Sequence, residues 1–464
     1  MRSAQLKFFA CIAIASVSVQ VSAQNVAPFK QGDRVVFAGN SITEAGYYES
    51  YIWLYYMTHF PERRFEIFNA GIGGNRAIDI YNRLDADVLN NKPTVIALDF
   101  GMNDSGFFEW NQPDKAAQAT KNIARSLKEY QAIEKRFLAL PDVKKIILTP
   151  SLYDETVKNP KNYWPGKAAA IDSISKFQLA SAKNNNWGAV DFFHEMTDIT
   201  LREQKKNPEF TITGPDRVHP GPQGHFVMAY IFLKAQGLAG KPVADVAIDA
   251  KTKKVIKSVN ATISKVTATL NSLSFDYLAN SLPYPIDTVP RIWENPYKQS
   301  DVLPFIPWTK EFNTEQLTIK NLQGKNYRLK IDGNIIGTWT AQQFAQGINL
   351  GQLQNTPQYM QAEDVRRLNQ QRIEVEGRLR EYYWIQFNYL QKHNMLFDDS
   401  EAVRDSVEAQ AKKDWGVAAK KDSYMKARVK ETRDAWVKEM NGYVNKIYTI
   451  NKPVKHKIEV LLIP

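Results

Sequence analysis

The stretch RVVFAGNSIT, residues 34–43, determines how the first half of the chain folds. It opens with the apolar run Val35–Ala38, which lacks polar alternation and is typical of a strand buried on both faces of a parallel sheet. Gly39 and Asn40 interrupt this run. Ser41 follows at a position where serine favours the start of a helix. The stretch therefore predicts a strand, a tight turn and a helix, which is the repeating unit of α/β proteins.

The same pattern recurs as far as residue 240. Four further apolar runs are candidate strands, at residues 65–70, 94–100, 145–149 and 188–193. Between and after them lie helix-like stretches, near residues 47–60, 78–90, 114–138, 167–184 and 222–236. Such alternation predicts a parallel sheet with right-handed crossovers, which binds its ligand at the carboxyl ends of the strands.

The second half of the chain has a different pattern of apolar residues. Candidate strands lie at residues 316–319, 327–331 and 335–340, with a hairpin signal, Asp332-Gly333, between the last two. Residues 357–448 carry two apolar stripes at helical spacing, which predict two long antiparallel helices with a shorter one between them. We therefore expect domains at residues 24–240, 241–356 (β-rich) and 357–464 (helical, with a strand near 457–463 that could return to the β module).

The first 23 residues have the pattern of a secretory signal peptide. Arg2 and Lys7 precede a short apolar run, and small residues end at Ala23. The run is too short to span a bilayer, so we expect a secreted or periplasmic protein and not a transmembrane one. Cys11 is the only cysteine and lies too early for lipid attachment. A mature chain that starts after Ala23 would have no disulfide, cysteine nucleophile or Cys-based zinc site.

The formal net charge is +11. Charges of both signs are interleaved, which favours surface ion pairs and solubility over attraction to an acidic partner. The sequence contains no compact basic tract, so nucleic-acid binding is not expected. The sequence leaves the oligomeric state open.

Four polar blocks lie where the predicted strands end or the last helix begins. They contain Ser41, Gly74, Asn103 and the pair Asp216 and His219. A serine hydroxyl needs a base to attack an ester at neutral pH, and His219 can supply it while Asp216 orients the imidazole. The backbone N–H groups of Ser41 and Gly74 and the Asn103 amide can stabilise the oxyanion that forms.

Each block alone has a plainer interpretation. Ser41 could be only a helix cap, and the glycines at 71–74 only a turn. Those glycines also resemble a dinucleotide fingerprint, but Arg76 stands where its third glycine belongs. The joint occurrence favours catalysis. His225 lies inside the last helix, where we expect packing, and the other histidines have no ligand spacing, so no metal or cofactor is predicted.

These blocks, in this order, resemble the SGNH (GDSL-type) hydrolase family over roughly Asp33–Gly240. The resemblance implies a three-layer α/β/α domain with a five-stranded parallel sheet and serine ester hydrolysis without metal or organic cofactor. It places Ser41, Asp216 and His219 in the catalytic triad, and Ser41, Gly74 and Asn103 in the oxyanion hole. One departure is Asn40, where the family usually has Asp. A catalytically inactive glycan-binding protein therefore stays open as an alternative.

The substrate is less well defined. Tyr47, Arg76, Phe107 and Trp110 lie near the catalytic blocks in sequence and are candidate substrate contacts. Exported SGNH proteins with a β accessory module resemble bacterial carbohydrate esterases, which predicts removal of acetyl (short acyl) groups from a carbohydrate. The expected partner is a small-molecule or polysaccharide ester substrate. A lipase or general carboxylesterase is the alternative.

Overall fold

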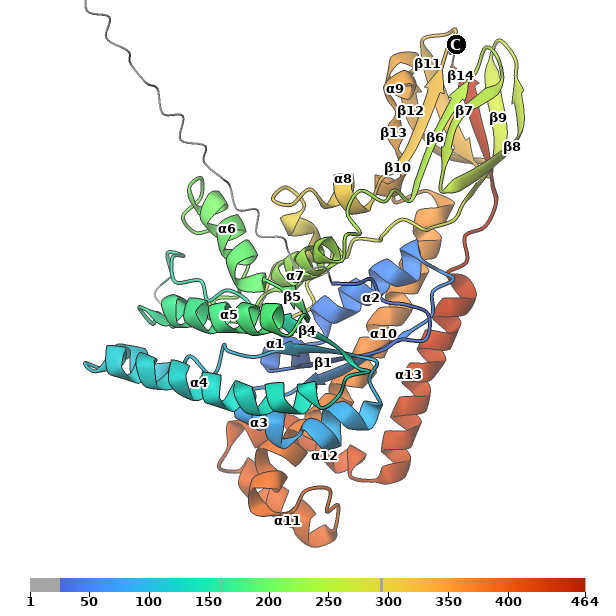
Figure 1. Ribbon diagram of the computed structural model, residues 1–464. Helices are drawn as coiled ribbons and strands as arrows, with labels where there is room; N and C mark the ends of the chain where they lie inside the picture. The colour runs from blue at the N-terminus through green and yellow to red at the C-terminus, as the bar shows by residue number, and fades with distance from the viewer. Residues whose placement is uncertain (1–25, 160, 293–294, 464) are drawn as a thin grey trace, which may run out of the picture.

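The computed structural model describes residues 26–159, 161–292 and 295–463. An α/β unit is followed by a β sandwich and by a helical region whose long helices run alongside the α/β unit (Figure 1). The expected signal peptide, with Cys11 and the cleavage site at Ala23, lies outside the described residues. Within the described ranges, no helix combines the length and the apolar character needed to cross a bilayer.

The first unit contains five parallel strands in the order β2-β1-β3-β4-β5. Their bounds are β1 (Arg34–Gly39), β2 (Glu66–Gly71), β3 (Val95–Asp99), β4 (Lys144–Leu148) and β5 (Gly188–Val190). The predicted five-stranded parallel sheet is confirmed. The last strand is shorter than expected, because Asp191 accepts a hydrogen bond from the His194 N–H and caps helix α6 (Phe192–Gln204).

Both faces of this sheet are covered. Val35 and Phe37 point into one core, with α6, α2 (Tyr47–His59) and α7 (Pro222–Ala235). Val36 and Ala38 point into the other, with α3 (Ala77–Asn82), α4 (Lys115–Leu138) and α5 (Lys167–Asn184). The expected helix at 78–90 is divided into α3, a π-helical turn (Leu84–Val88) and a 3₁₀ turn (Leu89–Asn91). The result is the three-layer α/β/α arrangement.

The β sandwich contains two sheets, ordered β13-β10-β6-β7 and β12-β11-β14-β9-β8. The strands are β6 (Ala244–Asp249), β7 (Lys254–Val259), β8 (Ala261–Ala268), β9 (Ser272–Ala279), β10 (Glu315–Lys320), β11 (Asn326–Ile331), β12 (Asn334–Thr340), β13 (Ile348–Asn349) and β14 (His456–Leu462). Both sheets contribute to one core, which includes Val246 and Phe275. Asp332 and Gly333, with φ of 51° and 83°, join β11 to β12 as a tight hairpin.

The segment between β9 and β10 packs against the α/β unit rather than the sandwich. It contains a 3₁₀ turn (Gln299–Val302) and helix α8 (Trp308–Phe312), and Tyr284 and Trp308 are fully buried in the first core. Other short helices are α1 (Ser41–Glu44), α9 (Ala341–Gln346), the π-helical turn Gln386–Leu390 and the 3₁₀ turns Phe108–Asn111, Leu350–Gln352 and Gln391–His393.

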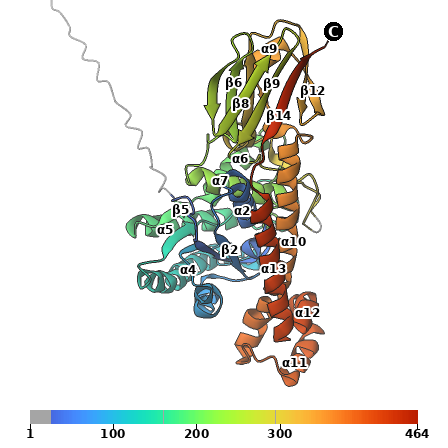
Figure 2. The same ribbon diagram turned by 90° about the vertical axis from the view of Figure 1, so that its right-hand side faces the viewer.

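The helical region contains α10 (Pro357–Ile385), α11 (Glu401–Ala411), α12 (Trp415–Ala427) and α13 (Lys430–Ile450). The two long helices, α10 and α13, lie side by side, as Figure 2 shows. Two short helices lie between them instead of the expected one, because Asp414 caps a second helix by accepting from the N–H groups of Gly416 and Val417. After α13 the chain returns as β14 between β9 and β11.

Helix α10 packs against β2, the edge strand of the parallel sheet. An edge strand has outward-facing backbone groups without strand partners, and these must be satisfied or covered. Here the Asn69 N–H donates to Glu376 Oε1 at 3.4 Å, and Arg380 Nε donates to the Gly71 carbonyl at 3.1 Å. The helical region thus completes the edge of the sheet beside the predicted site.

Candidate active site

Ser41 follows the carboxyl end of β1 and begins the short helix α1 (Ser41–Glu44). Asn40 is the N-cap, and its Oδ1 accepts a hydrogen bond from the Ile42 N–H at 2.9 Å. An aspartate at this position could make the same bond, so the exchange of Asp for Asn preserves the cap. The first N–H groups of a helix have no intrahelical acceptor, which leaves the Ser41 N–H available to a ligand.

Asp216 and His219 lie in the loop before α7, and the fold brings them to Ser41. Ser41 Oγ is 2.8 Å from His219 Nε2, and His219 Nδ1 is 2.5 Å from Asp216 Oδ2. The second oxygen, Asp216 Oδ1, accepts from the N–H groups of Val218 and His219 at 3.1 and 3.0 Å. Burial alone would raise the pKa of Asp216. The hydrogen bonds and charge of His219 outweigh burial, so this pKa lies below its usual value.

Arg217 anchors the loop that carries Asp216 and His219. Arg217 adopts a left-handed conformation with φ of 64°. Its guanidinium donates to the carbonyl oxygens of Lys161 and Asp154 at 2.9 and 2.8 Å. Arg217 thus anchors the backbone between Asp216 and His219. The site itself is open, since half of the His219 side-chain surface remains exposed.

The loop after β2, residues 71–75, approaches Ser41 through its glycines. A Cβ at Gly71 would come within 2.1 Å of the Glu44 backbone nitrogen, so only glycine allows this contact. Gly74 has φ of +82°, which also favours glycine. No hydrogen bond within the described part of the chain occupies the N–H groups of Ser41 or Gly74. Asn103 Nδ2 donates to the Asn75 carbonyl at 2.9 Å, which brings the third block to the same loop.

A buried carboxyl group supports the Asn103 block. Asp104 accepts from the N–H groups of Ala77 and Gly101, each at 3.1 Å, and from Ser126 Oγ at 3.0 Å. Burial raises the pKa of Asp104 to about 6. The block is thus tied to the helices that follow β2 and β3.

The four candidate substrate contacts have different surroundings. Tyr47 Oη donates to the Arg291 carbonyl at 3.1 Å, and Arg76 Nη1 is 3.9 Å from Glu129 Oε1. The Phe107 ring lies 3.8 Å from Lys167 Nζ. Trp110 is buried, and its indole N–H donates to the Ser105 carbonyl at 3.0 Å. Among these residues Trp110 packs in the core.

A tryptophan that sequence reasoning did not single out lies beside the loop that approaches the nucleophile. A Cβ at Gly73 would be 3.3 Å from Trp384 Nε1 and 3.7 Å from Ser41 Cβ. Gly416, at the start of α12, packs against the same indole. The helical region therefore forms a wall beside Ser41. Only the tertiary contact between α10 and the β2 loop reveals it, because Trp384 looks like any aromatic residue of an amphipathic helix.

Two family models match the chain, and they cover different units. A GDSL-like lipase/acylhydrolase family model matches residues 37–226, and a diltiazem deacetylase C-terminal helical domain model matches residues 363–452. The solved structure of a gut microbial diltiazem-metabolizing enzyme is 43% identical and has a TM-score of 0.93. The match covers 95% of this chain and 100% of that one. The chain belongs to the SGNH (GDSL-like lipase/acylhydrolase) family.

Membership of the SGNH family confirms the sequence-based prediction at the level of reaction class: the protein is a carboxylic ester hydrolase of SGNH type. An acetylxylan esterase from Geobacillus stearothermophilus is 27% identical over 224 residues, which are 44% of this chain and 94% of that esterase. A solved structure of the same esterase is 25% identical, covers 45% of this chain and 95% of its own, and has a TM-score of 0.35.

Proposed function

We propose that this chain removes acetyl groups from esters, with Ser41 as nucleophile, His219 as general base and acid, and Asp216 as the residue that orients His219. The proposal is supported above all by the unbroken line of short contacts from Ser41 Oγ through His219 to Asp216, at 2.8 and 2.5 Å. The lowered pKa of Asp216 keeps a negative charge beside the imidazole, which stabilises the imidazolium that forms during catalysis.

The reaction proceeds in two halves. Ser41 Oγ attacks the ester carbonyl while His219 Nε2 takes the hydroxyl proton, and the carbonyl oxygen becomes an oxyanion. The N–H groups of Ser41 and Gly74 and the Asn103 amide stabilise this oxyanion. Collapse breaks the bond to the alcohol, which leaves with the proton from His219, and acetyl-Ser41 remains. Water, deprotonated by His219, then attacks the acetyl carbonyl. Collapse breaks the bond to Ser41 Oγ, which takes the proton back from His219, and acetate leaves.

For the acyl group, two similarities support acetyl. The relative that matches the whole chain is a diltiazem-metabolizing enzyme, and a diltiazem deacetylase model covers the helical region. The more distant relative is an acetylxylan esterase. We propose an acetylated carbohydrate as substrate, because the half-exposed His219 gives an open site that a bulky glycan can approach. A small acetylated molecule is the second candidate, favoured by the identity of 43% over 95% of the chain.

The test compares acyl groups and alcohols separately. The protein and its Ser41→Ala variant are incubated with p-nitrophenyl acetate, butyrate and octanoate, then with acetylated xylooligosaccharide and diltiazem, and released acid is measured. We expect a preference for acetate and no turnover by Ser41→Ala. A preference for octanoate would support a lipase instead. Glycan binding without release of acid from any ester would support the inactive glycan-binding alternative.

Export is a separate proposal. Residues 1–23 carry the signal-peptide pattern described above, and their removal would take away Arg2 and Lys7 and leave a net charge of +9. Amino-terminal sequencing of the protein recovered from a bacterial host's periplasm or medium tests this. A first residue at 24 is expected, whereas retention of Met1 in the cytoplasmic fraction would contradict export.

A further inference from the structure

The peptide group between Gly73 and Gly74 determines where the Gly74 N–H points. A trans peptide is planar, so the carbonyl of Gly73 and the N–H of Gly74 point in opposite directions. The described part of the chain contains no cis peptide bond. Whatever holds the Gly73 oxygen therefore also aims the Gly74 N–H. In the proposed mechanism that N–H is one of the three oxyanion donors.

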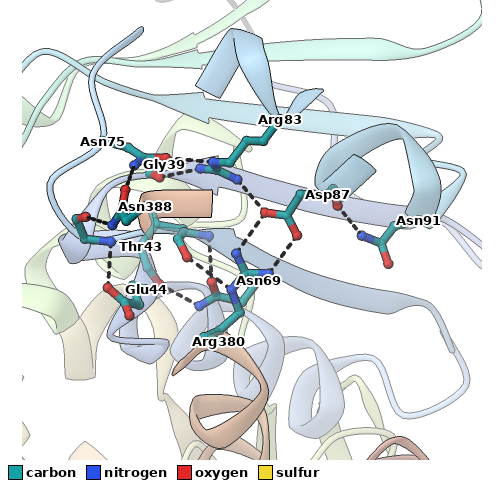
Figure 3. A network of polar contacts seen from close by, with 12 residues as sticks. Gly39, Thr43, Glu44, Asn69, Asn75, Arg83, Asp87, Asn91, Arg380 and Asn388 are labelled. Carbon is teal, nitrogen blue, oxygen red and sulfur yellow. Dashed lines mark hydrogen bonds and ion pairs between the residues drawn. The ribbon is translucent and has the colours of Figure 1, made fainter. Parts of the chain in front are cut away.

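Asn388 holds this oxygen. Its Nδ2 donates to the Gly73 carbonyl at 3.0 Å, and its Oδ1 accepts from Asn75 Nδ2 at 3.1 Å. One side chain of the helical region thus contacts both neighbours of Gly74 (Figure 3). Asn388 lies in a π-helical turn, Gln386–Leu390, that continues α10, and such turns are frequent at functional sites.

The orientation of the Asn388 amide follows from its partners. Arg83 can only donate, and its Nε donates to Asn75 Oδ1 at 2.7 Å. Asn75 must therefore present its Nδ2 to Asn388, whose Oδ1 accepts. This leaves the Asn388 Nδ2 facing the Gly73 carbonyl. The Arg83 guanidinium therefore determines, through Asn75, that the Nδ2 of Asn388 faces the Gly73 carbonyl.

The base of the loop is anchored by a buried ion cluster. Arg380 of α10 donates to both oxygens of Asp87 at 2.8 Å and to the Gly71 carbonyl at 3.1 Å. Arg83 binds the same Asp87 and also donates to the Gly39 carbonyl, just before Ser41, at 2.9 Å. The three charged side chains are almost fully buried. Figure 3 shows the cluster between the ends of β1 and β2 and helix α10.

Two backbone hydrogen bonds restrain the ends of the loop: the Ile72 N–H donates to the Gly39 carbonyl at 3.1 Å, and the Asn75 N–H donates to the Ile72 carbonyl at 3.2 Å. A Cβ at Gly74 would meet no atom within 4 Å, so packing does not fix this residue. Besides Asn388, the Gly73 peptide is held by Glu44, whose Oε2 accepts from the Gly73 N–H at 2.7 Å. That bond lies on the other peptide plane of Gly73. Among the described residues, the bond from Asn388 is the one hydrogen bond on the plane shared with Gly74.

We propose that Asn388 is a positioning residue: it orients the Gly73–Gly74 peptide so that the Gly74 N–H faces the oxyanion. The helical region thereby takes part in catalysis, although it supplies no member of the triad. The inference rests on the proposed serine mechanism. Donation to the Gly73 oxygen also polarises that peptide, which makes the Gly74 N–H a stronger donor.

The test uses two variants and a matched control in the full chain. Asn388→Ala removes both bonds, and Asn388→Asp keeps the size but cannot donate to the Gly73 oxygen. The control is Gln391→Ala, because Gln391 Nε2 makes the same type of bond across the same interface, to the Asn82 carbonyl at 3.1 Å, away from the loop. Steady-state hydrolysis of p-nitrophenyl acetate is measured for each. Inhibition by phenylboronic acid, which forms a tetrahedral anion on the serine, is measured in parallel.

We expect kcat to fall about 10- to 100-fold in Asn388→Ala, with KM changed by less than about 3-fold, because losing a whole oxyanion donor costs about 100- to 1,000-fold. Asn388→Asp should lose at least as much, and the affinity for phenylboronic acid should fall by the same factor as kcat. Gln391→Ala should stay within about 2-fold of the parent in kcat.

Three kinetic results would overturn the proposal: kcat within 2-fold of the parent in both Asn388 variants, an effect on KM alone, or an equal loss in Gln391→Ala. Circular dichroism separates folding from catalysis. If both Asn388 variants lose activity only together with their folded signal, the residue is structural and the proposal is wrong. Failure of the serine mechanism itself is recognised independently, by activity in Ser41→Ala equal to that of the parent.

Discussion

Replacing Asp87 by asparagine perturbs the junction between the helical region and the α/β unit at a single carboxylate. Asp87 is paired with Arg83 and with both terminal nitrogens of Arg380, and all three side chains are at most 5% exposed. Burial alone would raise the pKa of Asp87, but the two guanidinium groups outweigh it and lower that pKa. Asp87→Asn keeps the shape and leaves two buried cations without a counter-ion.

The expected cost is large because the cluster is buried. Removing one partner of a buried ion pair costs about 3–5 kcal/mol, whereas an exposed pair contributes about 0–1 kcal/mol. Asp85 lies two residues away in the same turn and pairs with Arg136 at 2.5 Å, with the two side chains 72% and 37% exposed. Asp85→Asn is therefore a matched control for which we expect a loss of at most about 1 kcal/mol.

The assay is urea denaturation at pH 7, followed by circular dichroism and by tryptophan fluorescence. The difference between the two variants should be at least about 2 kcal/mol in the free energy of unfolding. Equal stability of Asp87→Asn and Asp85→Asn would refute the reasoning, because the cluster would then contribute no more than a surface pair.

Two further predictions concern pH. Burial, followed by the charge of Asp104, raises the pKa of Asp99 to about 8, so the unfolded chain loses this proton first and stability should fall as pH rises from about 4 to about 8. In urea titrations at pH 5 and pH 8, Asp99→Asn should reduce this fall in stability, by at most about 1.4 kcal/mol per pH unit. The same stability difference between the two pH values as in the parent would contradict the prediction. Burial lowers the pKa of His59 to about 3, so the unfolded chain takes up the proton first and stability should fall as pH drops from about 6.5 toward 3. His59→Gln should flatten the decrease in Tm over this range, and a decrease as steep as in the parent would argue against a buried neutral imidazole.

The sequence predicted the α/β unit well because its signals are local. The apolar run Val35–Ala38 has no polar alternation, and β1 (Arg34–Gly39) contains the whole of it. Helix α5 likewise spans the predicted residues 167–184. Helix α6 was missed, because Phe192 and Phe193 continue the apolar run of β5. Only the side chain of Asp191, which caps the helix, ends the strand there.

The site was only partly predictable. Ser41 and His219 are 178 residues apart, yet their blocks were recognisable because each lies at an element boundary. The contribution of α10 to the site could not be predicted from the sequence. Arg372, Glu376 and Arg380 are spaced four residues apart, a pattern that usually indicates a solvent-exposed face with ion pairs. They are buried because they find partners in the α/β unit: Arg372 donates to Ser50 Oγ, Glu376 accepts from the Asn69 N–H, and Arg380 donates to the Gly71 carbonyl. Asn388, a single amide in a helical stretch, has no sequence signal at all.

The central claim is that Ser41 performs the chemistry, and one measurement tests it most directly. The protein and Ser41→Ala are treated with a fluorophosphonate, the labelled peptide is identified by mass spectrometry, and hydrolysis of p-nitrophenyl acetate is measured before and after treatment. The account predicts a single adduct on Ser41, loss of activity in step with labelling, and activity at least about 1,000-fold lower in Ser41→Ala. An adduct on another residue, or activity in Ser41→Ala equal to that of the parent, would contradict it.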